Sequence, residues 1–322
     1  MIFVVNDMHG DADLVRDVVS DIEDNCRPGD IVIVNGDGAG ARGPIMNEVV
    51  KLFYEVRRGE TDKKELIDYI SGIIIDLPDI PDEWIFDTVH AGMFRKLLAD
   101  RYPRFKAILE EELATVLEET LSQLSRAVRQ CDAKLVYLPG NGEITPLDLE
   151  TDDITTEETI NSEDRYYNRL AREGYFDKFD VEYVEYAKLL PGGVLLLSTN
   201  LLDLDKDDAK MWLGNMGVLS APISNVVVHY PPAIAPLGKC FTFWKPNKTD
   251  VKRTEMVEFI LNQLGTRCKK KSARQRGVSM LVFGHIHCGP HDPRMDPFPA
   301  LMTFSISGVA SVWQKPGSLL GL

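Results

Sequence analysis

Short runs of apolar residues recur along the chain, and each predicts a buried strand. Two of these apolar segments, 181–190 and 194–198, flank a Pro-Gly-Gly turn, and together they predict a hairpin. Leu301–Ile306 is expected to be the final strand. The other predicted strands lie at 2–6, 31–35, 134–139, 225–228 and 278–283.

Apolar residues at three- and four-residue spacing predict helices between these strands, and thus an α/β fold in one domain over 1–322. A helix at about 12–24, with Asp11 as its N-cap, joins the first two strands, which should therefore be parallel. Residues from about 45 to 130 form a largely helical insertion. The insertion lies either beside the edge where the strands end or on the far face without a role there. Its predicted helices, and those after it, lie at 45–58, 62–75, 109–128, 211–219 and 251–264.

Candidate metal ligands follow five of the predicted strands, at the point where each strand ends. In α/β sheets, ligands bind at this carboxyl edge. Oxygen from Asp and Asn, mixed with imidazole nitrogen, suits divalent ions such as Mn, Fe or Zn, and the lack of cysteine argues against a structural zinc site. Asp37, from the second strand beside the first, is the natural carboxylate to bridge a pair of ions. The motifs read D-x-H-G, G-D, G-N, H-x-P-P and G-H-x-H, and the candidate ligands in them are Asp7, His9, Asp37, Asn141, His229, His285 and His287.

Composition narrows the classes of function. The 322 residues carry a net charge of −14, which argues against a general binder of nucleic acid or of anionic membranes. No apolar run approaches the length of a membrane span, and the first strand starts directly after Met1, which leaves no room for a signal peptide. The five widely spaced cysteines are typical of reduced thiols. We therefore expect a cytoplasmic protein that would meet nucleic acid only as a substrate.

The five motifs in this order resemble the calcineurin-like metallophosphoesterase superfamily, and they extend over residues 7–287. The resemblance implies a four-layer α/β/β/α sandwich with a helical insertion, in which the predicted hairpin belongs to a second, mixed sheet. It also implies two divalent metal ions, which could be Mn, Fe, Zn, Ni or Mg. By the resemblance, one ion takes Asp7, His9, Asp37 and His287, and the other takes Asp37, Asn141, His229 and His285.

The chain departs from this superfamily after two of the motifs. Many members read G-N-H, where the His is a general acid toward the leaving group, but here Gly142 follows Asn141. Phosphoprotein phosphatases continue G-D-x-x-D-R-G-P, whereas this chain lacks that Asp and has the Arg-Gly-Pro one residue late. Arg42 of this Arg-Gly-Pro is the candidate substrate-binding residue, as a bidentate donor to phosphate.

Together, these features predict a metal-dependent phosphoric ester hydrolase. The resemblance implies that water attacks phosphorus while His285 and the metals stabilise the developing charge. Because the general acid is missing, we expect a phosphodiester or an activated ester to be a better substrate than a simple monoester. Two alternatives stay open: a monoesterase similar to protein serine/threonine phosphatases, and a non-catalytic scaffold on the same fold.

Several other residues have both a functional and an ordinary interpretation. His90 in the insertion and His291 after the last motif either replace the missing acid or are surface or core histidines. Tyr230 and Trp244 either stack on a base or pack in the core or a loop. The basic run within 267–276 is either a clamp for a polyanionic substrate or a solvated loop.

Overall fold

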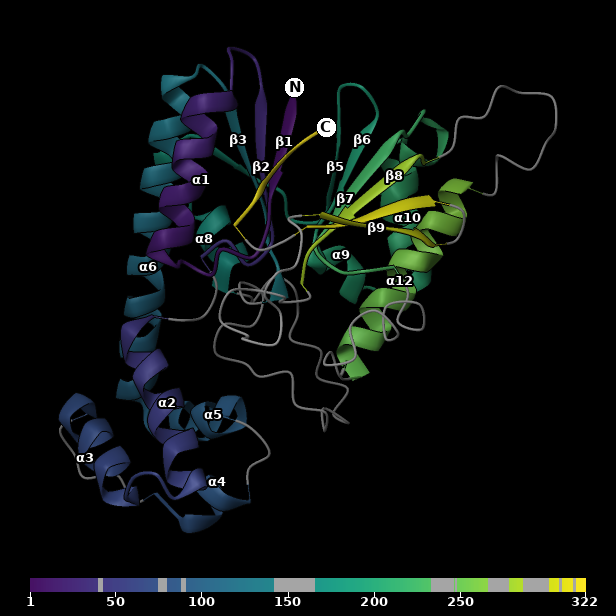
Figure 1. The fold of residues 1–322 in the computed structure, drawn as a ribbon. Coiled ribbons are helices and arrows are strands. Elements are labelled where there is room, and N and C mark those ends of the chain that lie inside the picture. The colour runs from purple at the N-terminus through teal and green to yellow at the C-terminus, as the bar shows by residue number, and fades with distance from the viewer. Residues whose placement is uncertain are drawn as a thin grey trace.

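The three-dimensional structure is a computed structural model in which two sheets pack face to face, with helices on their outer faces (Figure 1). The two chain termini lie close together, and the backbone N–H of Leu322 donates to the carbonyl oxygen of Ile2. The structure describes residues 1–39, 43–74, 80–87, 91–141, 166–232, 246, 248–265, 278–285, 301–306, 309–314 and 317–322.

The first sheet has the strand order β11-β1-β2-β3-β4. Strands β1 to β4 are parallel, and β11 pairs antiparallel with β1. Helix α1 (Ala12–Asn25) joins β1 to β2, and the Asp11 side chain caps it by accepting from the N–H groups of Asp13 and Leu14, so both predictions for this unit are confirmed. The strands are β1 (Ile2–Val5), β2 (Ile31–Asn35), β3 (Lys134–Leu138), β4 (Val181–Tyr183) and β11 (Leu319–Gly321).

The second sheet has the strand order β5-β6-β7-β8-β10-β9. Strands β6, β7, β8 and β10 are parallel, and the edge strands β5 and β9 pair antiparallel with their neighbours. The strands are β5 (Ala187–Leu190), β6 (Val194–Leu197), β7 (Asn225–Val228), β8 (Met280–Phe283), β9 (Leu301–Ile306) and β10 (Val309–Gln314). The helices on its outer face are α9 (Thr199–Asp203), α10 (Lys206–Asn215) and α12 (Lys248–Gly265). Helices with two mostly parallel sheets confirm the α/β class.

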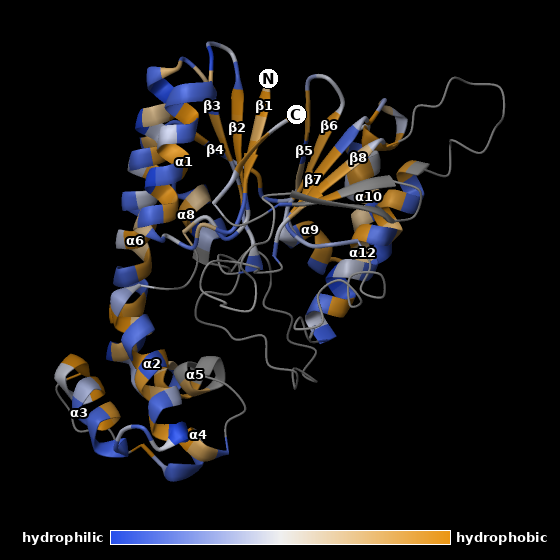
Figure 2. Ribbon diagram, in the orientation of Figure 1, coloured by the Kyte–Doolittle hydropathy of each residue, from blue (hydrophilic) through white to orange (hydrophobic). Residues whose placement is uncertain are grey.

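Alternate residues of the central strands enter different cores, and these strands are apolar along their length (Figure 2). On β2, Ile33 lies in the core between the sheets, whereas Val32 and Val34 pack with α1 and with α6 (Pro103–Gln130). On β7, Val227 lies between the sheets, and its neighbours Val226 and Val228 pack with α12. Each such side chain contributes roughly 1.5–3 kcal/mol by its burial. Burial on both faces explains why these strands are unbroken apolar runs in the sequence.

Residues 44–130 supply, where the structure describes them, a group of helices that extends beyond the end of the first sheet (Figure 1). Helix α6 is 28 residues long and takes part in two cores. Its residues Phe105, Leu109 and Leu113 pack with α2 to α5, whereas Leu121 and Leu124 pack with α1 and the first sheet. We call α2 to α5 together with the N-terminal half of α6 the helical cluster. The added helices are α2 (Pro44–Arg58), α3 (Lys63–Ile74), α4 (Asp82–Phe86) and α5 (Ala91–Arg101).

Three details of the sequence prediction were wrong. Residues 181–190 are not one strand, because β4 belongs to the first sheet and only β5 forms the hairpin with β6. Between them the chain crosses from one sheet to the other, with Val184 buried in the core between the sheets. Leu301–Ile306 is not the final strand, since β10 and β11 follow it.

The third error concerns α10, which begins at Lys206, earlier than expected. The Asp205 side chain caps it by accepting from the N–H groups of Asp207 and Asp208. Two short helical segments before it, α8 (Tyr166–Arg172) and η2 (Phe176–Phe179), and the turn η3 (Val218–Ser220) after it, complete the described elements.

Candidate metal centre

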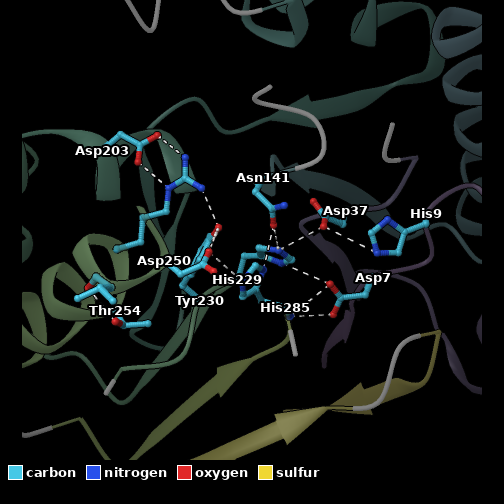
Figure 3. Close-up of polar contacts among 12 residues, drawn as sticks. Asp7, His9, Asp37, Asn141, Asp203, His229, Tyr230, Asp250, Thr254 and His285 are labelled. Atoms are coloured by element: carbon cyan, nitrogen blue, oxygen red, sulfur yellow. Dashed lines mark hydrogen bonds and ion pairs between the residues drawn. The ribbon is translucent and has the colours of Figure 1, made fainter. Parts of the chain in front are cut away.

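Six of the seven predicted ligands lie in the described part of the chain, and they come together where parallel strands of both sheets end (Figure 3). From the first sheet, Asp7 follows β1, Asp37 follows β2 and Asn141 follows β3. From the second sheet, His229 follows β7 and His285 follows β8, and His9 lies on the loop between β1 and α1. Because the two sheets pack face to face, the two sets of strand ends meet in one place.

Asp7, His9 and Asp37 form the first part of this centre. Each of the three offers a ligand atom within 4.8 Å of those of the other two, so this group could hold a metal ion. His9 Nε2 lies 3.8 Å from Asp37 Oδ2. Both carboxylates are only 1% exposed, and charged groups buried to this degree are commonly paired or coordinate a metal.

Asn141, His229 and His285 form the second part. Asn141 Oδ1 lies 3.0 Å from His229 Nε2 and 2.9 Å from His285 Nδ1. His229 Nε2 also lies 3.6 Å from Asp37 Oδ2, the same oxygen that faces His9. One carboxylate oxygen therefore lies between the two parts of the centre.

Contacts on the far sides of the two imidazole rings indicate which nitrogen carries hydrogen. His229 Nδ1 lies 3.1 Å from the carbonyl oxygen of Asn35, which can only accept, so the hydrogen is on Nδ1. His285 Nε2 lies 3.3 Å from Asp250 Oδ1, which would accept a hydrogen on Nε2 when Nδ1 serves as a metal ligand. In the neutral rings, the lone pairs of His229 Nε2 and His285 Nδ1 then both point at Asn141 Oδ1. An amide oxygen and two imidazole nitrogens held this close are the kinds of donor that a divalent cation takes.

Four of the candidate ligands have a left-handed backbone, with φ of 52° at Asp7, 53° at His9, 48° at Asp37 and 67° at His285. This conformation costs a residue with a side chain about 1–2 kcal/mol. Backbone hydrogen bonds between the loops after β1 and β2 hold it in place: the N–H of Asp7 donates to Gly36 at 3.1 Å, and the N–H of His9 donates to Asp37 at 2.7 Å. Strain that clusters at ligand positions is typical of functional sites.

The glycines in two of the motifs make room for the ligands of other strands. A Cβ atom at Gly140 would lie 2.2 Å from Asp37 Oδ1, and one at Gly284 would lie 2.3 Å from Asp7 Oδ2. Only glycine lets these backbones approach the carboxylates so closely. The Gly that precedes a ligand in G-N and G-H was therefore a sequence signal of close packing, which the prediction did not use.

Helix α6 contacts the loop that carries His9. A Cβ atom at Gly10 would lie 2.2 Å from Val116 Cγ1, and Val116 lies near the middle of α6. Four residues earlier, the Glu112 carboxylate accepts from the N–H groups of Ile45 and Met46 at the start of α2. Burial raises the pKa of Glu112, and the two N–H groups act in the opposite direction. The insertion thus lies beside this edge of the sheets.

Two further side chains lie at this site, of which Asp250 was not predicted as part of it. Asp250, in the first turn of α12, contacts the far side of His285. Tyr230 is fully buried, and its ring centroid lies 4.0 Å from that of His285, so the packing interpretation holds for it and base stacking does not. Polar residues at the start of an amphipathic helix usually face solvent, and nothing in the local sequence showed that Asp250 is buried.

The remaining predicted candidates lie outside the described residues. They are His287, Arg42, His90, His291 and Trp244, together with the basic run at 267–276, and Gly142 lies outside them as well.

Comparisons with known proteins add little to this geometry. No protein-family model matches the chain, and no curated protein matches it either. A crystal structure with 12% sequence identity aligns with 97% of this chain and 88% of its own, at a TM-score of 0.40. Among the described helices, none has both the length and the apolar composition needed to cross a membrane.

Proposed function

We propose that this chain is a dinuclear metal-dependent phosphoesterase, built on the four-layer α/β/β/α metallophosphoesterase sandwich, and that it hydrolyses a phosphodiester. The observation that carries the proposal is the position of Asp37. Its Oδ2 atom lies 3.8 Å from His9 Nε2 and 3.6 Å from His229 Nε2, a position that suits a carboxylate shared by two ions.

The donor set fits two divalent ions. Asp7, His9 and Asp37 would hold one ion, and Asp37, Asn141, His229 and His285 would hold the other. His287 is proposed as a further ligand of the first ion from the sequence resemblance alone. Carboxylate and amide oxygens mixed with imidazole suit Mn, Fe, Zn, Ni or Mg. When bound, such ions would polarise a phosphoryl oxygen and activate water for attack at phosphorus.

The protein's own residues would orient these groups. With ions bound, His229 Nδ1 would donate to the carbonyl oxygen of Asn35 and His285 Nε2 would face Asp250, so both rings would turn a lone pair toward the centre. Protonation of the leaving group is a separate requirement, and the position that carries the acid in many relatives is Gly142. The absence of a general acid typically lowers the rate by roughly 10²–10⁴-fold, and it does so most for a poor leaving group. For this reason we propose a phosphodiester or an activated ester as the substrate.

The alternative of a protein-phosphatase-like monoesterase depends on the Arg-Gly-Pro after Asp37. In the structure, Gly43 is the N-cap of α2 and Pro44 is its first residue. Proline is common at the first position of a helix, so a local structural role accounts for the Gly-Pro part of this motif. The alternative of a scaffold remains less favoured, because Asp7, His9, Asp37, Asn141, His229 and His285 all lie together.

Metal analysis of the purified protein, with the variant Asp37→Asn, tests the proposal. Asparagine tolerates the left-handed backbone of this position about as well as aspartate, so the fold should survive. We expect the bound metal to fall toward zero and activity to fall by more than the roughly 10–100-fold that loss of an outer partner costs. Asp132→Asn is a matched control, since Asp132 also has a positive φ (53°) but is no candidate ligand. Full metal content and full activity in Asp37→Asn would sink the assignment.

The substrate part of the proposal has its own measurement. The wild-type protein should hydrolyse bis-nitrophenyl phosphate faster than nitrophenyl phosphate, and simple alkyl monoesters slowest, because nitrophenolate leaves without a proton. If alkyl monoesters react as fast as the activated diester, the phosphodiester proposal is wrong and another group supplies the proton.

A further inference from the structure

A chain of buried polar side chains leads from α9 to His285, behind the candidate metal centre (Figure 3). Asp203 ends α9, Arg253 and Asp250 lie on α12 one helical turn apart, and Tyr230 follows β7. Tyr230 is fully buried, Arg253 is 2% exposed and Asp250 is 7% exposed. Buried ionised groups seldom add stability over apolar packing, so a network of this size points to a role at the site it reaches.

The hydrogen bonds of this side-chain network all run from donor to acceptor in one direction, which Arg253 sets. Its Nε and Nη2 donate to the two carboxylate oxygens of Asp203, at 2.6 and 2.9 Å. Its Nη1 donates to the Tyr230 hydroxyl at 2.7 Å, and a guanidinium can only donate. The hydroxyl hydrogen of Tyr230 is then available for Asp250 Oδ1, 3.2 Å away.

Asp250 Oδ1 therefore faces both groups: it accepts from the Tyr230 hydroxyl and lies 3.3 Å from His285 Nε2. With its hydrogen on Nε2, His285 has its lone pair on Nδ1, which lies 2.9 Å from Asn141 Oδ1. The Tyr230 ring also lies against the imidazole, with 4.0 Å between centroids and 30° between planes. The contact with Asp250 would favour a hydrogen on Nε2 when Nδ1 binds a metal ion, and the contact with Tyr230 restrains the plane of the ring.

We propose that Asp250 and Tyr230, anchored by the Arg253–Asp203 pair, are positioning residues that tune His285 as a ligand and so set the affinity of one metal site only. The inference rests on the proposed dinuclear centre. The site affected is the one made by Asn141, His229 and His285, because Asp250 and Tyr230 contact the ring of His285, whose Nδ1 faces Asn141. Loss of an outer hydrogen-bond partner typically weakens a metal site by roughly 10–100-fold.

Cobalt(II) titration of the metal-free protein tests this, followed by visible absorption and by calorimetry. Tyr230→Phe removes one hydroxyl and keeps the ring against His285, and Asp250→Ala removes the acceptor. In each variant, one of the two cobalt ions should bind roughly 10–100-fold more weakly and with an altered absorption spectrum, while the other binds as in wild type. Tyr183→Phe is the matched control, because it removes a hydroxyl that donates to Asn168 instead, and it should bind both ions normally.

The double variant Tyr230→Phe/Asp250→Ala shows whether Tyr230 acts on His285 through Asp250 or whether the two residues act independently. If Tyr230 acts through Asp250, the double variant should bind cobalt no more weakly than Asp250→Ala alone. Wild-type binding of both ions by both single variants, or additive losses in the double variant, would overturn the positioning role and leave the metal centre intact. A wild-type protein that binds no cobalt would instead overturn the proposed function, and this inference with it.

Discussion

In the helical cluster, residues that pack together come from one continuous part of the chain. Phe53 stacks on Phe94 at 5.0 Å, and the whole core lies between Met46 and Leu113. At the strand ends, by contrast, the backbone N–H of His285 donates to Asp7 Oδ2 across 278 residues of sequence. Of the six described ligands, the cluster supplies none. The cluster should therefore tolerate change that the strand ends do not, and α6, which belongs to both regions, is the place to test this.

The largest effects are expected from cavities in the two halves of α6. Leu109→Ala, in the helical cluster, and Leu124→Ala, against α1 and the first sheet, should each cost about 2–5 kcal/mol of stability. Hydrogen exchange measured by mass spectrometry shows where the cost falls. Leu109→Ala should speed exchange in α2, α3 and α5 and leave β1 to β3 protected, whereas Leu124→Ala should expose the strands as well.

The amount of metal that each of these two variants retains is a second measurement of the same contrast. Leu109→Ala should bind metal as wild type does, and Leu124→Ala should lose it more readily, because Leu124 supports the strands that carry Asp7 and Asp37. If both variants speed exchange equally in the cluster and in the strands, the two regions are one cooperative unit and the contrast between them fails.

The same contrast explains which features were predictable from sequence. Strands such as β2 are buried on both faces and short in sequence, so a continuous apolar run was enough to find them and the ligand that follows each. Strands β4 and β11 have three residues each and owe their existence to partners far along the chain, which no local pattern shows. The Asp203–Arg253–Tyr230–Asp250 chain was missed for a related reason. Its members are ordinary polar residues until the second sheet, α9 and α12 bring them together.

A smaller effect is expected when one substitution, glycine to alanine, is made in both regions. Gly140 has no positive φ, so alanine fits its backbone, but the new Cβ would lie 2.2 Å from Asp37 Oδ1. Gly140→Ala should therefore destabilise by about 1–3 kcal/mol and displace the bridging carboxylate, with loss of bound metal. Gly72, in α3, has nothing within 4 Å of its Cβ position, and Gly72→Ala should stabilise by up to about 1 kcal/mol without any change in metal content.

Thermal unfolding and metal analysis of the two alanine variants are sufficient to check this pair. Full metal content in Gly140→Ala would show that the strand ends can move apart far enough to accommodate the new Cβ atom beside Asp37 Oδ1. The close approach at Gly140 would then not be a requirement of the site.

The smallest effect concerns Glu112, at the junction of the two regions. Burial raises its pKa, with the N–H groups of Ile45 and Met46 acting against the rise. The folded protein then holds this proton more tightly than the unfolded chain does. Its contribution to stability is therefore full below the unfolded glutamate pKa, about 4.3, and is lost as the pH rises through the folded pKa.

Glu112→Gln keeps an acceptor oxygen for α2 but does not titrate, so the wild type should lose stability relative to this variant across that interval. Denaturant unfolding of both proteins over a pH series measures the difference, in which titrations common to both cancel. A stability difference that stays constant with pH, or that changes in the opposite direction, would show that burial at this junction does not control the pKa of Glu112. Metal affinity should be the same in Glu112→Gln as in wild type, because Glu112 is not a candidate ligand.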